Sequence, residues 1–230
     1  MDTLSGKVVV ITGASGQLGR ALADEVLAQG GQAALLDIGA ASGTPRPATR
    51  HWPVDLSSLP AACNVLEEVA KHLGRIDALA NVAGGFRWQT LADSEDLSEF
   101  GALHSMNLIT CVTACKATLP HLERAGNGRI VNVGAMGALK GGNGMGAYAA
   151  SKAGVIRFTE ALADELKSQG ITVNAVLPSI IDTPQNRADM PKANPDLWVK
   201  PQEIARVMCF LMSDAAAAVT GALVPVTGRG

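Results

Sequence analysis

Aromatic residues are scarce in this sequence, which has four Phe, three Trp and one Tyr among its 230 residues. With so few rings and with Lys and Arg scattered along the chain, it lacks the stacking platform and basic surface of a nucleic-acid-binding protein. No apolar run reaches the roughly 18 residues that a membrane-spanning helix requires. The six residues before the first apolar run show no signal pattern. We therefore expect a cytoplasmic protein that binds neither nucleic acid nor membrane.

Cysteine is also infrequent. The four cysteines are Cys63, Cys111, Cys115 and Cys209. Their spacing is not that of metal ligands. Cys111 and Cys115 can share a helix face, but free cysteine commonly packs as a small hydrophobic residue. We predict four reduced core residues and no metal site.

Short apolar runs alternate with longer segments of helical spacing. Strands are expected at Lys7–Thr12, Gln32–Asp37, His51–Asp55, Ala78–Val82, Arg129–Val133, Ile171–Leu177 and Ala222–Val226. Helices are expected at Leu18–Gln29, Ser57–Leu73, Ser94–Arg124, Ala147–Gln169 and Gln202–Ser213. Such alternation indicates an α/β fold, a doubly wound parallel sheet of about seven strands with helices on both faces. Without a repeat or a linker, residues 1–230 are expected to form one domain.

A glycine-rich turn, Thr12–Gly19, follows the first expected strand and opens the first helix. Small residues let a backbone approach a diphosphate closely, and the amide hydrogens of a helix beginning near Leu18 point toward it. That position is the one a dinucleotide site requires. The turn therefore predicts a dinucleotide cofactor.

Asp37 ends the second expected strand, 18 residues beyond Gly19. A carboxylate at this place can accept hydrogen bonds from the ribose hydroxyls of an adenine nucleotide. Its charge repels a 2′-phosphate, and neither Ile38 nor Gly39 supplies a compensating base. NAD(H) is thus favoured over NADP(H). The alternative is a solvated acid at a strand end.

Tyr148 and Lys152 stand four residues apart in the expected helix Ala147–Gln169, so they lie on one face, one turn apart. A phenol with its ordinary pKa of about 10 transfers protons poorly at neutral pH. A nearby ammonium is expected to lower that pKa into a useful range. The alternative is an ordinary surface pair.

Further short motifs lie at the ends of other expected elements. Asp55-Leu56 follows the third strand, Asn81-Val82-Ala83-Gly84 ends the fourth, Asn107 lies in the long helical segment, and Pro178 and Thr183 follow the sixth strand. With the glycine turn, Asp37 and the Tyr148–Lys152 pair, these motifs resemble the short-chain dehydrogenase/reductase family over nearly the whole chain.

The resemblance implies a Rossmann-type NAD(P)-dependent oxidoreductase for a small organic substrate. It assigns catalysis to Tyr148, Lys152 and Asn107. It places cofactor contacts at Gly13, Ser15, Gly16, Gln17, Leu18, Gly19, Asp37, Asp55, Leu56, Asn81, Ala83, Gly84, Tyr148, Lys152, Pro178 and Thr183. Pairing through the helices Ser94–Arg124 and Ala147–Gln169 would give a homodimer or homotetramer.

Three positions depart from the family pattern. Gln17 replaces a glycine of the turn, Ser179 replaces the glycine after Pro178, and Ala135 stands where the catalytic serine belongs, 13 residues before Tyr148. Loss of an oxyanion donor typically costs about a hundred- to a thousandfold in rate. The segment Gly137–Tyr148 is similar to that of one branch, the dihydropteridine reductases, which also lacks the serine.

Four functions therefore stay open: a reductase of that branch, an ordinary carbonyl or 3-oxoacyl reductase, a dinucleotide sensor without turnover, and a structural role without a cofactor. A substrate loop is expected at about residues 179–200, where prolines replace any sheet pattern. Arg187, Met190 and Trp198 are its candidate contacts with a planar ring. The alternative is a packed surface loop anchored by Trp198.

Overall fold

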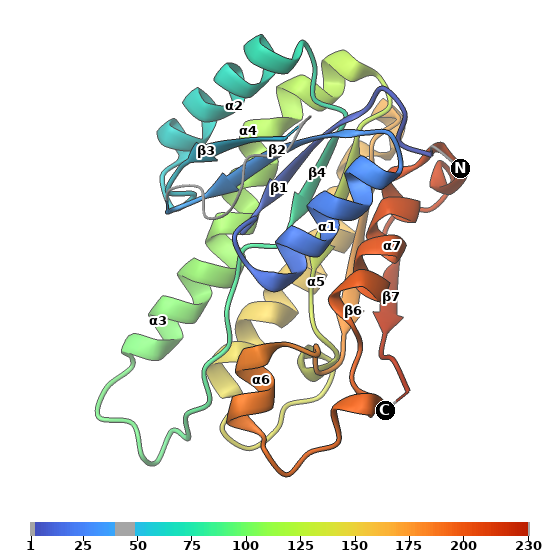
Figure 1. The fold of residues 1–230 in the computed structure, drawn as a ribbon. Coiled ribbons are helices and arrows are strands. Elements are labelled where there is room, and N and C mark those ends of the chain that lie inside the picture. The colour runs from blue at the N-terminus through green and yellow to red at the C-terminus, as the bar shows by residue number, and fades with distance from the viewer. Residues whose placement is uncertain (1–2, 40–48, 230) are drawn as a thin grey trace.

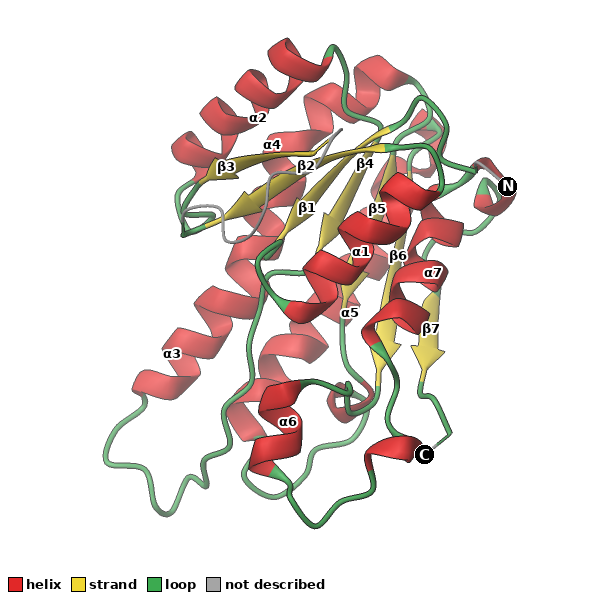
Figure 2. Cartoon of the chain, in the orientation of Figure 1, coloured by secondary structure: helices red, strands yellow, loops and turns green. Residues whose placement is uncertain are grey.

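The fold is built around one parallel sheet. The structure, a computed structural model, describes residues 3–39 and 49–229. Its strands are β1 Val8–Thr12, β2 Gln32–Asp37, β3 Thr49–Pro53, β4 Ala78–Asn81, β5 Arg129–Val133, β6 Thr172–Pro178 and β7 Leu223–Val226. They are ordered β3-β2-β1-β4-β5-β6-β7 (Figure 2). The seven-stranded α/β fold expected from the sequence is confirmed.

Helices cover both faces of the sheet (Figure 1). On one face α1 Gln17–Ala28 packs against α7 Pro201–Met212. On the other face α2 Leu59–Leu73 packs against α4 Thr110–Ala125, and α5 Gly146–Leu166 lies on β6. The remaining helices are α3 Ser98–His104 and α6 Pro184–Asp189, with single turns at Met136–Ala138, Lys167–Gln169, Pro195–Leu197 and Asp214–Ala216.

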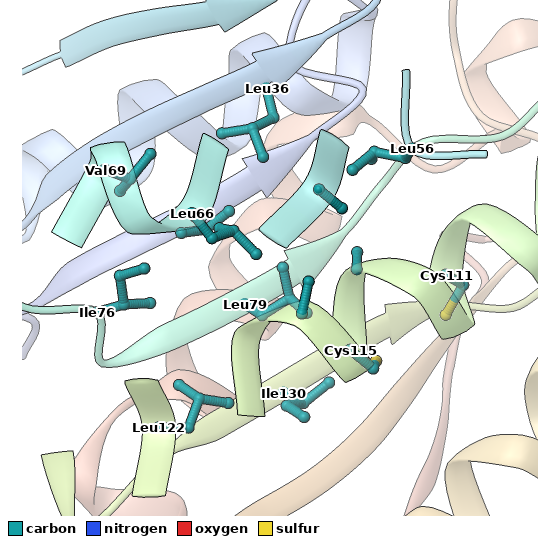
Figure 3. Packing of buried hydrophobic residues seen from close by; sticks show 14 of the residues in the cluster. Leu36, Leu56, Leu66, Val69, Ile76, Leu79, Cys111, Cys115, Leu122 and Ile130 are labelled. Atoms are coloured by element: carbon teal, nitrogen blue, oxygen red, sulfur yellow. The ribbon is translucent and has the colours of Figure 1, made fainter. Parts of the chain in front are cut away.

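The strand residues alternate between two cores. Val9 and Ile11 of β1 pack with Leu22 and Met208 beneath α1 and α7. Val10 points to the opposite face, where the core lies beneath α2 and α4. Figure 3 shows members of this second cluster, which are Leu36, Leu56, Leu66, Val69, Ile76, Leu79, Cys111, Cys115, Leu122 and Ile130. Both faces of the central strands β1, β4 and β6 are therefore buried, as a doubly wound sheet requires.

The prediction of one continuous helix at Ser94–Arg124 is wrong. Residues 94–97 are not helical, and a π-helical turn at Ser105–Ile109 separates α3 from α4. A π turn holds an extra residue, and such turns are frequent at functional sites. Here the π turn carries Asn107.

Two smaller expectations also need correction. The third strand begins two residues earlier than predicted, because Thr49 and Arg50 already pair with Ala33 and Ala34 of β2. Cys63 is exposed rather than buried, since it falls on the outer face of α2, while the other three cysteines are buried.

The predicted substrate loop contains α6 and one 3₁₀ turn, and both of its ends are fastened. Ile181 forms a bridge with Val199, and the Asp182 amide donates to the Val199 carbonyl at 2.8 Å. Trp198 is only 8% exposed. Burial favours the anchoring role of Trp198 over a contact with substrate. Across the described ranges, no helix has the length and apolar character to cross a membrane.

Candidate active site

The site begins where β1 and β4 lie side by side and the strand order reverses direction. Parallel α/β sheets bind ligands at such a switch point, beyond the carboxyl ends of the strands. The Thr12 hydroxyl oxygen accepts hydrogen bonds from the amides of Val82 and Ala83 at 3.0 and 3.1 Å. Gly13 has φ +63°, and a Cβ there would lie 2.7 Å from the Ala83 backbone. The turns after the two strands are thus locked together.

The glycine turn offers its backbone and little else. Gly16 begins α1 without a side-chain cap, and the first turn of α1 has no acidic residue. Uncapped amides at a helix N-terminus attract a diphosphate. Leu18 and Gly19 are buried, whereas Gln17 is exposed. The side chain that replaces the usual glycine at position 17 therefore lies outside the packed part of the turn. A dinucleotide diphosphate fits this cradle.

Asp37 reaches back to the same turn. Its carboxylate accepts hydrogen bonds from the amides of Ser15 and Ile38, each at 2.8 Å. The charge is therefore fixed beside the glycine turn, where an adenine ribose would lie. Asp55 accepts from the Ser57 amide at 2.9 Å, and hydrogen bonding from Ser57 lowers the pKa of its carboxyl. Leu56 is buried in the core, so only its backbone can face a cofactor.

Lys152 and Asn107 both lie beside Gly84, just after the end of β4. The Lys152 ammonium donates to the Val133 carbonyl at 2.8 Å. Asn107 exchanges two hydrogen bonds with the Gly85 backbone, accepting at 2.8 Å and donating at 3.1 Å. A Cβ on Gly84 would lie 2.6 Å from Asn107 Oδ1 and 3.2 Å from Lys152 Nζ. Glycine at position 84 lets both polar groups converge.

Ser151 joins this group, and the sequence analysis missed it. Its hydroxyl donates to the Tyr148 carbonyl at 2.8 Å and accepts from Asn107 Nδ2 at 2.9 Å. Ser151 is buried, so few alternative partners exist. It could have been found from its place directly before Lys152, since a polar residue on the inner face of a helix needs a partner.

The acid–base groups have shifted pKa values. Burial raises the pKa of Tyr148 to about 12 and lowers the pKa of Lys152 to about 8. The expectation that Lys152 lowers the Tyr148 pKa is wrong for this structure, because the loss of hydration around the phenol dominates. The phenol is consequently protonated throughout the neutral range.

The Asn81 side chain bonds to other parts of the fold and not to the glycine turn. Its side chain is buried and donates to Asn132 Oδ1 at 2.9 Å and to Cys115 Sγ at 3.2 Å. Asn132 in turn donates to Thr159 of α5 at 2.9 Å. This buried chain fastens β4, β5 and α5 together, so any contact of Asn81 with a cofactor is through its backbone.

The remaining predicted positions lie at the ends of β5 and β6. Ala135 is buried in extended backbone just after β5. Pro178 ends β6, and Thr183 caps α6 by accepting from the Asn186 amide at 3.1 Å. Ser179 donates to the Thr227 carbonyl at 2.8 Å, so its hydroxyl serves the fold.

Two aromatic residues of the loop after β4, Phe86 and Trp88, were also missed. The Phe86 and Tyr148 rings make an edge-to-face contact with centroids 4.9 Å apart. Trp88 donates its indole hydrogen to the Asn143 carbonyl at 3.0 Å. Within residues 3–39 and 49–229, no cluster of three or more His, Cys, Asp or Glu side chains could hold a metal ion.

The switch point, the uncapped glycine turn and the strand-end acid define an α/β domain of the dinucleotide-binding class. A family model described as short chain dehydrogenase matches residues 7–194. The chain belongs to the short-chain dehydrogenase family and is an oxidoreductase that uses a nicotinamide cofactor.

Curated relatives agree along nearly their full length. The chain is 37% identical to the 3-oxoacyl-acyl-carrier-protein reductase FabG of Pseudomonas aeruginosa, covering 98% of each chain. It is 33% identical to FabG of Escherichia coli, covering 97% of this chain and 96% of that protein.

Solved structures show the same arrangement. Carveol dehydrogenase from Mycobacterium avium, in complex with NAD, matches with a TM-score of 0.87 and 26% identity over 98% of each chain. The ligand-free aldohexose dehydrogenase of Thermoplasma acidophilum matches with a TM-score of 0.88 and 26% identity, over 99% of this chain and 94% of that one.

Proposed function

We propose that this protein is an NAD(H)-dependent carbonyl-type reductase in which Tyr148 delivers the proton and Lys152 and Asn107 hold the reacting groups. The convergence of Lys152 and Asn107 on Gly84, with Tyr148 one turn away on α5, carries the proposal. Family membership favours turnover over the sensor alternative, since a sensor has no need of these three residues together.

The cofactor preference rests on Asp37. Its carboxylate lies beside the Ser15 amide, where it would accept hydrogen bonds from ribose hydroxyls and repel a 2′-phosphate. The turn residues Gly13 to Gly19 would hold the diphosphate through backbone amides. Asp55, Ala83, Gly84, Pro178 and Thr183 would complete the contacts with the adenine and nicotinamide ends.

A bound nicotinamide supplies hydride to the substrate carbon. The chain's own residues supply position and a proton. Lys152 is fixed by Val133 and lies near Gly84, where it can hold ribose hydroxyls. Tyr148 donates its phenolic proton to the substrate atom that gains charge, and Asn107 lies beside Lys152 for proton resupply.

The pKa values favour the reductive direction at neutral pH. With a pKa of about 12, Tyr148 is a proton donor rather than a base. Oxidation of an alcohol would require the phenolate, which burial disfavours. We therefore propose that reduction is faster than oxidation at neutral pH.

Two substrate classes are supported by different observations. The FabG relatives favour a 3-oxoacyl or simple ketone substrate. The alanine at position 135 favours a conjugated substrate such as a quinonoid dihydropterin, which needs a second oxyanion donor less than a ketone does.

We propose that residues 1–230 act as one domain, in a cytoplasmic homodimer or homotetramer. The copies would pair through the helical segments Ser94–Arg124 and Ala147–Gln169. The segment 179–200 would border the substrate.

Oxidation of NADH and NADPH, followed by absorbance, tests the proposal against quinonoid dihydropterin, a quinone, a 3-oxoacyl thioester and simple ketones. We expect turnover with NADH of at least one of them. Failure of every cofactor and substrate pair would contradict the proposed activity.

A further inference from the structure

Half of the chain's aromatic residues gather at the first turn of α5. The chain has four Phe, three Trp and one Tyr. Phe86 contacts the Tyr148 ring with an interplanar angle of 85°. A Cβ on Gly144, which has φ +68°, would overlap the Trp88 indole, and Phe100 Cζ lies 3.6 Å from where a Cβ on Gly146 would be. Residues that are scarce elsewhere thus gather around the start of the helix that carries Tyr148, and one of them, Phe86, contacts the Tyr148 ring.

Phe86 and Trp88 remain open to solvent despite these contacts. They are 51% and 57% exposed. Leaving such rings half exposed forgoes much of the stabilisation that their burial would give. Because the indole hydrogen of Trp88 is taken by Asn143, the exposed remainder presents ring carbon. An apolar surface beside a reactive group is typical of a ligand groove.

The charge near this surface is neutralised. Arg87, between the two rings in sequence, pairs with Glu99 at 2.5 Å. Both side chains line a small hollow together with Phe100, Gly144 and Ala147. The ion pair therefore lies next to the aromatic residues at the start of α5. Ala135 adds no donor. The Arg87–Glu99 pair has no net charge, so it attracts a carboxylate or a phosphate less than an unpaired guanidinium would.

We infer that Phe86 and Trp88 form an aromatic wall of the substrate site that selects flat, uncharged, conjugated rings over open-chain or anionic acyl substrates. Offset or edge-to-face contact of a flat ring with two aromatic side chains gives affinity that a flexible chain cannot match, because the chain must also lose conformational freedom. This inference rests on the proposed reductase function and narrows its substrate class.

The test compares Phe86→Leu and Trp88→Leu with Phe210→Leu, which removes an equally exposed ring (49%) on α7. The probes are 1,4-naphthoquinone and isatin as flat rings, and ethyl 3-oxobutanoate as the open-chain ketone. For each variant, kcat/KM for a flat probe is divided by that for the open-chain probe. The division removes any common effect that Phe86 has on Tyr148.

We expect the ratio to fall at least tenfold in Phe86→Leu and Trp88→Leu, to stay within twofold in Phe210→Leu, and to be largely kept in Phe86→Trp. An unchanged ratio in both wall variants would overturn the inference. So would a change in sedimentation mass without a change in ratio, because the rings would then belong to an interface between copies.

Binding separates this inference from the proposed function. Calorimetric titration of isatin into the NAD⁺ complex, which cannot reduce isatin, should show at least tenfold weaker binding to Phe86→Leu than to wild type. If wild type reduces no probe but binds isatin in this wall-dependent way, the reductase proposal fails and the wall stands. If wild type reduces ketones but binds isatin no better than Phe86→Leu does, the wall is refuted.

Discussion

Lys152 Nζ donates a 2.8 Å hydrogen bond to the backbone carbonyl of Val133, which ties the start of α5 to the carboxyl end of β5. The contact fixes the ammonium beside Gly84 and Asn107. It is a buried charge with a neutral partner, an arrangement that lowers the pKa of an amine. The burial of Lys152 against β5 therefore both fixes the position of its ammonium and lowers its pKa.

A pH dependence of stability follows from Lys152. Burial lowers its pKa from 10.5 to about 8, so between these values the folded state binds fewer protons than the unfolded state. Stability must then rise with pH in that window, relative to a variant without the amine. Urea unfolding of wild type and Lys152→Met across this range should show the difference growing in favour of wild type. A constant difference would mean that Lys152 titrates normally in the folded protein.

Gly19 is predicted to be intolerant of any side chain. A Cβ there would lie 2.7 Å from the Ala14 backbone, a clash that the turn cannot relieve by a rotamer change. Gly19→Ala should lower stability by about 1–3 kcal/mol and weaken NADH binding. Gly101→Ala on α3 is the matched control, because nothing lies within 4 Å of its Cβ position. Equal melting temperatures and NADH affinities in the two variants would argue against the locked turn.

Asp37 is predicted to set the cofactor preference. Asp37→Asn keeps an oxygen that can accept from Ser15 but removes the charge that opposes a 2′-phosphate. We expect KM for NADH to rise about tenfold and discrimination against NADPH to shrink, since a charged hydrogen bond contributes about 1.5–3 kcal/mol. The exposed Glu68→Gln on α2 serves as the control. Steady-state kinetics with both cofactors that show an unaltered preference would remove Asp37 from this role.

Restoring the missing hydroxyl should help simple ketones most. Ala135 is buried in extended backbone after β5, where a serine could donate to a developing oxyanion. Ala135→Ser is expected to raise kcat for ethyl 3-oxobutanoate about tenfold or more, with a smaller effect on conjugated rings. Ala138→Ser, in the following turn, controls for added polarity. A loss of activity on both substrate classes would show that the site is built for alanine.

Much of the fold could be predicted because the signals are local. Gln32–Asp37 and Arg129–Val133 are observed with the predicted bounds, since each is a short apolar run bounded by turn residues. The π turn at Ser105–Ile109 could not be predicted, because it depends on Asn107 bonding to Gly85, 22 residues away. Edge pairing shifted β3 for a similar reason: its register depends on β2 and not on its own pattern.

In the candidate site, too, local features could be predicted from the sequence, and features that depend on distant residues could not. The four-residue spacing of Tyr148 and Lys152 was readable from helical periodicity alone. The direction of the Tyr148 pKa shift was not, because its hydration depends on side chains such as Phe86 that approach from a distant loop. Ser151 and Asn132 were missed because their partners lie on other elements.

The most direct measurement of the central claim is NADH oxidation by wild type and Tyr148→Phe, with NADH affinity measured in parallel by fluorescence titration. Removing the phenolic hydroxyl should lower kcat about a hundred- to ten-thousandfold, the usual contribution of a positioned proton donor, with NADH affinity nearly unchanged. Equal turnover by the two proteins would contradict proton delivery by Tyr148 and the mechanism built on it.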